Sequence, residues 1–186
     1  PALGETVERE VSQEFATTIF KVDPDHGRGA WAHLWRDVLA ALDEMPVAVR
    51  KGSRVFLHHT AISRRRISYL DEAVFGVTGA DKVELLTRAA ADLEYALDSV
   101  SKGSGDEPDV NLYNSLANAY FDLAKVKAAQ GAAADELTEL RRLASDATRH
   151  AYDQSPSSPY VIETHVKSLI ASAEEAGGDG ATYCIE

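Results

Sequence analysis

The chain has 186 residues, of which 45% are hydrophobic and 26% charged, and its formal net charge is −11 at pH 7. This length suits one domain of ordinary size, and this composition is typical of a soluble globular protein. The acidic balance disfavours general binding to nucleic acid and docking on an anionic membrane surface, because both carry negative charge. No run of roughly 18 apolar residues, the length of a membrane span, occurs in the sequence.

The terminal residues and the cysteine content bear on the compartment. The one cysteine, Cys184, excludes an intrachain disulfide and a CxxC metal site. Because the first residues also lack the pattern of a signal peptide, we expect a reducing, cytoplasmic compartment. The sequence opens on Pro1 without Met. We therefore expect either a chain whose initiator Met was removed or a fragment of a larger protein.

Seven segments with helical spacing of apolar residues follow one another along the chain. Residues 6–21 place apolar side chains at four-residue intervals, and residues 29–45 carry the clearest amphipathic stripe, with Trp31 and Trp35 as core residues. Turns rich in Gly, Pro and Ser separate them from five further segments at 53–74, 81–101, 109–130, 134–154 and 160–176. No segment shows the period of two that is typical of a strand. The sequence therefore predicts an all-α fold of six to seven helices.

We expect these helices to form one domain over residues 1–186. Residues 1–50 would form an N-terminal helical pair that either caps the remaining helices or belongs to the same array, and the sequence leaves both alternatives open. Residues 53–176 would form the array itself. The glycine-rich residues 177–186 predict a flexible tail.

Residues 109–156 carry the spacing of a helical-hairpin repeat. The positions that match are Tyr113, Leu116, Ala117 and Tyr120 in the first helix and Ala144, Thr148, Ala151 and Pro156 in the second. This stretch resembles the tetratricopeptide-repeat family, and the resemblance extends more loosely over residues 53–170. It implies stacked antiparallel hairpins in a right-handed superhelix, with a concave groove that holds a peptide or a partner helix. Arg64 departs from the pattern, since it stands where the family has an aromatic residue.

Carried onto residues 109–156, the resemblance implies that five residues of the first helix face the groove: Asn111, Asn114, Asn118, Phe121 and Asp122. Asparagine amides both donate and accept hydrogen bonds, which suits the backbone of an extended peptide. The alternative is a solvated helix face on which Asn111 helps to cap the helix start.

A basic cluster in residues 53–74 gives a second candidate site. The candidate anion-binding residues are His58, Arg64, Arg65 and Arg66, which could clamp a carboxylate or a phosphate. The alternative is an exposed ion-pair network with neighbours such as Asp71 and Glu72. Adjacent histidines on a helix point about 100° apart, so His58 and His59 are poorly placed to chelate one metal ion. We expect no metal site.

The sequence lacks the phosphate loop GxxxxGK[ST], the dinucleotide motif GxGxxG, the nucleophile elbow GxSxG and the zinc motif HExxH. We therefore expect no enzyme and no cofactor. Our first hypothesis is a protein-protein interaction module that binds a peptide or another protein, as the regulatory or sensor arm of a larger protein. The alternative is a phosphate- or nucleotide-ligand binder that uses the His58 to Arg66 helix. An enzyme with a carboxylate or histidine site in a helical bundle ranks last.

Overall fold

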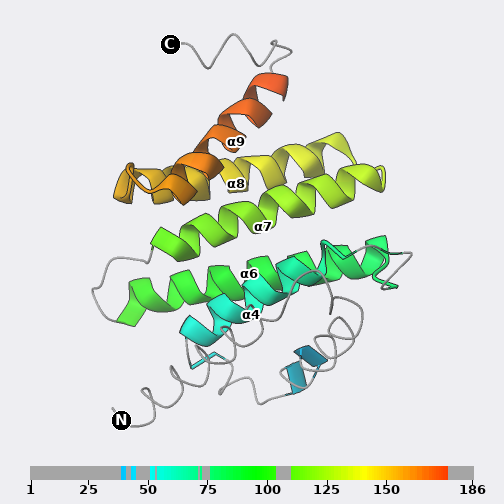
Figure 1. Ribbon diagram of the computed structural model, residues 1–186, viewed down its shortest axis with the longest axis horizontal. Coiled ribbons are helices and arrows are strands. Elements are labelled where there is room, and N and C mark those ends of the chain that lie inside the picture. Colours follow the sequence, from blue (N-terminus) through cyan, green and yellow to red (C-terminus); the bar gives the residue numbers. More distant parts are fainter. Residues whose placement is uncertain are drawn as a thin grey trace.

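All regular structure in the described part of the chain is helical. The computed structural model describes residues 39–40, 43–44, 51–52, 54–70, 72, 76–103 and 110–175. Its helices are α4 Arg54–Ile67, α6 Gly79–Gly103, α7 Val110–Ala129, α8 Ala134–Gln154 and α9 Pro159–Glu175 (Figure 1). The all-α class is thereby confirmed for this part. The predicted helix 6–21, most of the predicted helix 29–45 and the tail 177–186 lie outside the described residues.

Three helix ends agree with the local chemistry of the sequence. At the start of α6, the Thr78 amide donates to Asp81 Oδ2 at 2.8 Å and the Asp81 amide donates to Thr78 Oγ1 at 3.2 Å, which is a reciprocal capping box. At the end of α7, Gly131 takes a φ of +78°, and the amide of Ala132 donates to the carbonyl oxygen of Lys127 at 3.0 Å. This is the Schellman ending that glycine favours. Helix α9 begins at Pro159, where a missing amide hydrogen costs nothing.

Helix α4 ends at Ile67, so the prediction of a helix that continues to residue 74 was wrong. Beyond Ile67, the amides of Tyr69 and Leu70 donate to carbonyl oxygens only three residues back, at 3.2 and 3.0 Å. This tightening ends the helix. Gly76 then takes a φ of +65°, a left-handed conformation that turns the chain toward α6. Apolar periodicity alone did not reveal this end.

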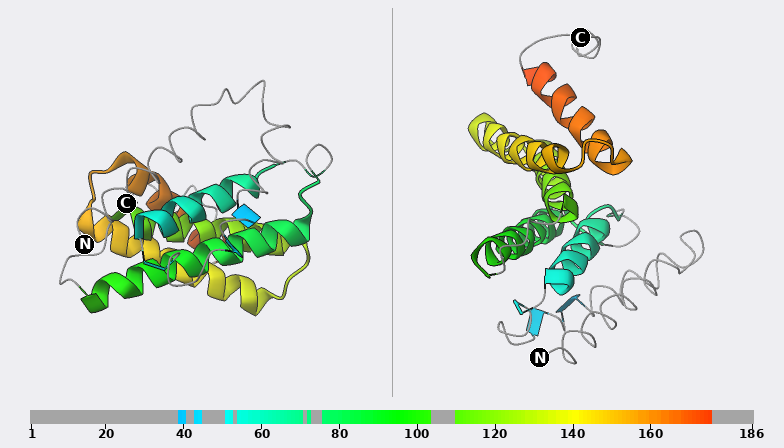
Figure 2. Two further views of the ribbon diagram at one scale, coloured as in Figure 1. Left: turned by 90° about the horizontal axis from the view of Figure 1, so that it is seen from below. Right: turned by 90° about the vertical axis from the view of Figure 1, so that its left-hand side faces the viewer.

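Each described helix packs on the next one in the chain, from α4 against α6 to α8 against α9. In addition, α7 contacts both α4 and α9. Seen end-on in Figure 2, α4 and α9 lie toward one side of the stack and α6 and α8 toward the other. The stack therefore brings α4, α7 and α9 together, although α6 and α8 separate them in sequence.

Alanine dominates the main core cluster, which spans α4, α6, α7 and α8. Eight of its buried residues are alanines: Ala61, Ala89, Ala90, Ala96, Ala117, Ala119, Ala144 and Ala147. Such small side chains let the helices approach closely. Larger side chains fill the space between them, among them Leu93 and Tyr120. The Tyr120 hydroxyl donates to Glu94 of α6, so the polar end of this buried ring has a partner.

Candidate functional site

Arg64 of α4 lies inside the protein, where it joins three segments of the chain. Its side chain is only 2% exposed, and its guanidinium pairs with Asp43 and with Asp92 of α6. Arg88 of α6 donates to the second carboxylate oxygen of Asp43 at 2.6 Å. Because a buried charge is stable only when it is paired, this arrangement makes Arg64 a junction residue between residue 43, α4 and α6.

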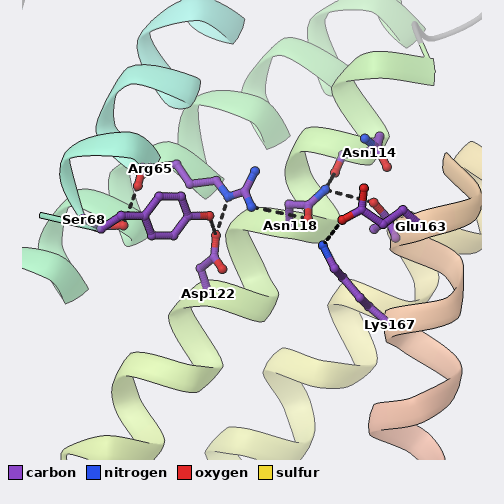
Figure 3. Close-up of polar contacts among 9 residues, drawn as sticks. Arg65, Ser68, Asn114, Asn118, Asp122, Glu163 and Lys167 are labelled. Carbon is purple, nitrogen blue, oxygen red and sulfur yellow. Dashed lines mark hydrogen bonds and ion pairs between the residues drawn. The ribbon is translucent and has the colours of Figure 1, made fainter. Parts of the chain in front are cut away.

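Arg65 points toward α7 instead, because successive helical residues are turned by about 100°. Its Nε donates to Asp122 Oδ2, and its Nη2 lies 3.4 Å from Asn118 Oδ1 (Figure 3). The Tyr69 hydroxyl donates to the same Asp122 oxygen at 2.5 Å. Burial raises the pKa of Tyr69, and the hydrogen bond to the Asp122 carboxylate raises it further. Tyr69 therefore stays protonated as a donor.

Asn118 carries the connection on to α9. It is only 9% exposed, and its Nδ2 donates to the Asn114 carbonyl oxygen at 2.8 Å and to Thr164 Oγ1 at 3.1 Å. We call Arg65, Tyr69, Asn118, Asp122 and Thr164 the three-helix network. Its members link the end of α4 to α7 and α7 to α9. The two candidate sites of the sequence, the basic cluster and the asparagine stripe, thus meet at one place.

The other sequence-predicted residues lie outside this network. His58 Nε2 lies 2.8 Å from Ser115 Oγ of α7, and Arg66 is exposed. Asn111 is exposed in the first turn of α7, whereas Phe121 is half-buried and packs against the core cluster. The buried Asn114 Oδ1 accepts no hydrogen bond from any residue that the structure describes.

Sequence reasoning missed Tyr69 and Thr164 as members of the site. Neither stands in a local pattern that marks it, because each acts through a partner about 50 residues away. It also missed the ion pair between Lys167 Nζ and Glu163 Oε1, which are 2.6 Å apart on α9 (Figure 3). Lys167 lowers the pKa of Glu163, and the positive charge of Arg65 contributes in the same direction. Glu163 therefore lies within electrostatic reach of Arg65.

A cavity of about 340 Å³ lies beside Arg64. Its charged lining residues are Asp43, Asp81, Glu84, Arg64 and Arg88. The carboxylates outnumber the guanidinium groups, and both arginines already pair with these or nearby carboxylates. The charge balance of this cavity disfavours a phosphate group.

None of the described helices is long and apolar enough to cross a membrane. Among the described residues, no group of three or more His, Cys, Asp or Glu side chains is arranged to hold a metal ion.

Comparison with protein families gives a match to the first part of the chain. A family model described as Novel STAND NTPase 7 matches residues 1–68, just over a third of the chain. Comparisons with curated proteins and with solved structures find no match. The matched segment contains all of α4, including Arg64 and Arg65. The similarity to an NTPase family therefore ends inside the helical stack, on a helix that packs against α6 and α7.

Replacing Arg64 with Ala would leave the carboxylates of Asp43 and Asp92 without their buried partner. We expect the free energy of unfolding to fall by about 3 kcal/mol, measured by urea denaturation with circular dichroism. The matched control is Arg142→Ala on α8, since Arg142 is 55% exposed and pairs with Glu139 and Asp146. Loss of this exposed arginine should lower the free energy of unfolding by less than about 1 kcal/mol. Equal losses in the two variants would contradict the junction role of Arg64.

His59 gives a pH dependence. Burial lowers the pKa of His59 in the folded chain. Below about pH 6.5, His59 is therefore protonated in the unfolded chain while it is still neutral in the folded chain. Stability should therefore decline as the pH falls from about 6.5 toward the folded pKa. His59→Gln should flatten this decline, measured as Tm between about pH 8 and pH 5.5. An unchanged decline in His59→Gln would refute the assignment.

Proposed function

We propose that the described helices form a tetratricopeptide-like interaction module, which binds a peptide or a partner helix on the surface shared by α4, α7 and α9. The three-helix network is the observation that carries this proposal. It unites residues from three helices that are distant in sequence, and it does so where the asparagine stripe and the basic cluster meet. Side chains held by such hydrogen bonds are preorganised, which lowers the entropic cost of binding.

The chemistry around the network suits a polypeptide ligand. Tyr69 is 56% exposed and presents an aromatic ring beside a hydroxyl group. Asn111 adds an exposed amide, and Glu163 and Lys167 add both signs of charge. Tyrosine and arginine are enriched among the residues that dominate binding energy at interfaces. A peptide backbone alternates donors and acceptors, and asparagine amides offer both.

We further infer that this module is the regulatory or sensor arm of a larger, cytoplasmic, NTPase-related protein and has no catalytic site of its own. The family match supports this inference, because α4 belongs both to the matched segment and to the helical stack. Arg64 strengthens the connection between the matched segment and the helical stack, because it pairs both with Asp43 of the matched segment and with Asp92 of α6. A shift of the matched segment would therefore act directly on the first helix of the module.

The second candidate is a phosphate- or nucleotide-ligand site on the His58 to Arg66 helix. It is favoured by the exposure of Arg66 and by the position of α4 inside the NTPase-family match. It ranks below the peptide-binding function because Arg64 and Arg65 already hold carboxylate partners. A phosphate group would have to compete with Asp122 for Arg65.

A displayed library of short random peptides, selected on the full chain, provides a probe for the proposed surface. The selected peptide should bind the Tyr69→Ala/Asn111→Ala variant at least about tenfold more weakly, because loss of an interface aromatic commonly costs 2 kcal/mol or so. Both changes lie on exposed side chains. The matched control is Thr138→Ala/Arg149→Ala on α8, also exposed, which should keep the full affinity. Isothermal titration gives the affinities.

Equal affinity of the selected peptide for both variants would contradict the proposed surface. Failure to select any peptide, together with binding of inorganic phosphate or a nucleoside triphosphate that Arg66→Glu abolishes, would favour the second candidate instead. Circular dichroism of each variant controls for loss of helix.

A further inference from the structure

Helix α9 turns polar side chains toward the stack. Over residues 159–171, its buried side chains are Val161, Thr164 and Ser168. Their spacing of three and four places them on one helical face. Four large aliphatic side chains are exposed instead: Ile162, Val166, Leu169 and Ile170. An amphipathic helix on a protein core normally buries its apolar side, so the interface that holds α9 is unusually polar.

Two side-chain hydrogen bonds join this polar face to α7 and α8. Thr164 Oγ1 accepts from Asn118 Nδ2 of α7 at 3.1 Å. Ser168 Oγ lies 2.7 Å from Ser145 Oγ of α8. When the helices separate, such groups bond to water instead, so each bond contributes little net stability to the docking of α9.

The ring contact between α9 and α8 leaves a polar atom without a partner. The His165 ring stacks on the Tyr152 ring of α8, with ring centroids 4.3 Å apart. The buried Nδ1 atom of His165 has no hydrogen-bond partner among the residues that the structure describes. A buried polar atom without a partner costs free energy, and separation of α9 would expose this atom to water.

Apolar burial holds the earlier described helices together and contributes little to the docking of α9. The main core cluster contains buried residues of α4, α6, α7 and α8 and none of α9, and the second cluster contains none of α9 either. Over residues 159–171, Val161 is the single buried apolar side chain. Because apolar burial is the dominant favourable term in folding, we expect α9 to be the least firmly held of the described helices.

The turn between α8 and α9 can bend while both helices keep their own backbone bonds. The Ser155 amide donates to the Ala151 carbonyl oxygen at 3.0 Å, at the end of α8. The Ile162 amide donates to the Ser158 carbonyl oxygen at 2.9 Å, at the start of α9. Pro159, the first residue of α9, has no amide hydrogen that could bond back to α8. The turn can therefore act as a hinge.

We propose that α9 is a detachable helix, which separates from α7 and α8 as one unit while α4, α6, α7 and α8 stay packed. Separation breaks the bond between Asn118 and Thr164, and it removes Glu163 and Lys167 from the surface that α4, α7 and α9 share. A peptide that contacts this surface favours the docked state, because a ligand shifts an equilibrium toward the state that it binds better. This coupling rests on the proposed peptide-binding function, whereas the release of α9 does not.

Native-state hydrogen exchange of the full chain in mild urea tests the release. The hydrogen-bonded amides of α9 should share one protection factor, because the helix opens as a unit. They should exchange about a hundredfold or more faster than the amides at the centre of α7. Protection that falls gradually toward Glu175 would mean fraying of the helix end, and protection equal to that of α7 would mean one global transition. Either result overturns the proposal.

Val161→Ala shortens the apolar side chain that α9 buries. This variant should quicken exchange in α9 by about tenfold and leave exchange in α7 unchanged, because only the docking of α9 is weakened. The matched control is Val166→Ala on the exposed side of the same helix, which should change exchange in α9 by no more than about threefold. Equal acceleration of α7 and α9 by Val161→Ala would show that α9 does not open separately.

A disulfide across the α8–α9 interface provides a locked state. Because Ser145 Oγ and Ser168 Oγ lie 2.7 Å apart, Ser145→Cys/Ser168→Cys places two thiols within reach of each other. Cys184→Ser in the same chain removes the natural thiol. Oxidation should slow exchange in α9 by about tenfold or more, and reduction should restore the original rate. Unchanged exchange in the oxidised chain, with the bond verified by mass, would contradict the release.

The peptide selected on the full chain tests the coupling. At saturation it should slow exchange in α9 by about tenfold or more, and the oxidised variant should bind it at least as tightly as the reduced one. A peptide that binds through Tyr69 and Asn111 but leaves exchange in α9 unchanged would overturn the coupling. Failure to select any peptide would contradict the proposed function instead, and exchange in the chain without peptide would still decide whether α9 is released.

Discussion

The position of α4 depends on two adjacent arginines that form ion pairs with different parts of the chain. Arg64 turns inward to Asp43 and Asp92, while Arg65 turns to Asp122 of α7. The chain has 30 Asp and Glu residues against 19 Lys and Arg residues, so carboxylate partners for the two guanidinium groups are in excess. Buried or half-buried guanidinium groups need fixed partners, and this need holds α4 against α6 and α7 at once.

This anchoring forms the side of the stack on which we propose that a peptide binds. Because α4 is fixed to α7, and Asn118 bonds α7 to Thr164 of α9, three helices present their side chains to one surface. Buried alanines of α6 and α8 pack with residues of α4 and α7 in the main core cluster. The family match reaches to residue 68, so the anchored helix is also the point where NTPase similarity and helical stack overlap.

Helical periodicity predicted the described helices well, and the predicted segment 134–154 has the bounds of α8. The alanines that match the hairpin repeat, such as Ala117 and Ala144, are buried as close packing requires. What the sequence did not reveal is which polar residues meet. Arg65 and Asp122 are 57 positions apart, and Asn118 and Thr164 are 46 apart, so no local spacing links them. The burial of Arg64 was also missed, because an arginine run by itself is typical of an exposed face.

The contact between Arg65 and Asp122 is the most direct test of this arrangement. A double-mutant cycle with Arg65→Ala, Asp122→Ala and the combined variant, followed by urea denaturation, isolates their coupling energy. Residues in one hydrogen-bond network couple, and because both side chains are partly exposed we expect a coupling of about 1 kcal/mol. Additivity within about 0.3 kcal/mol would mean that the two residues do not interact, and would contradict the shared surface of α4 and α7.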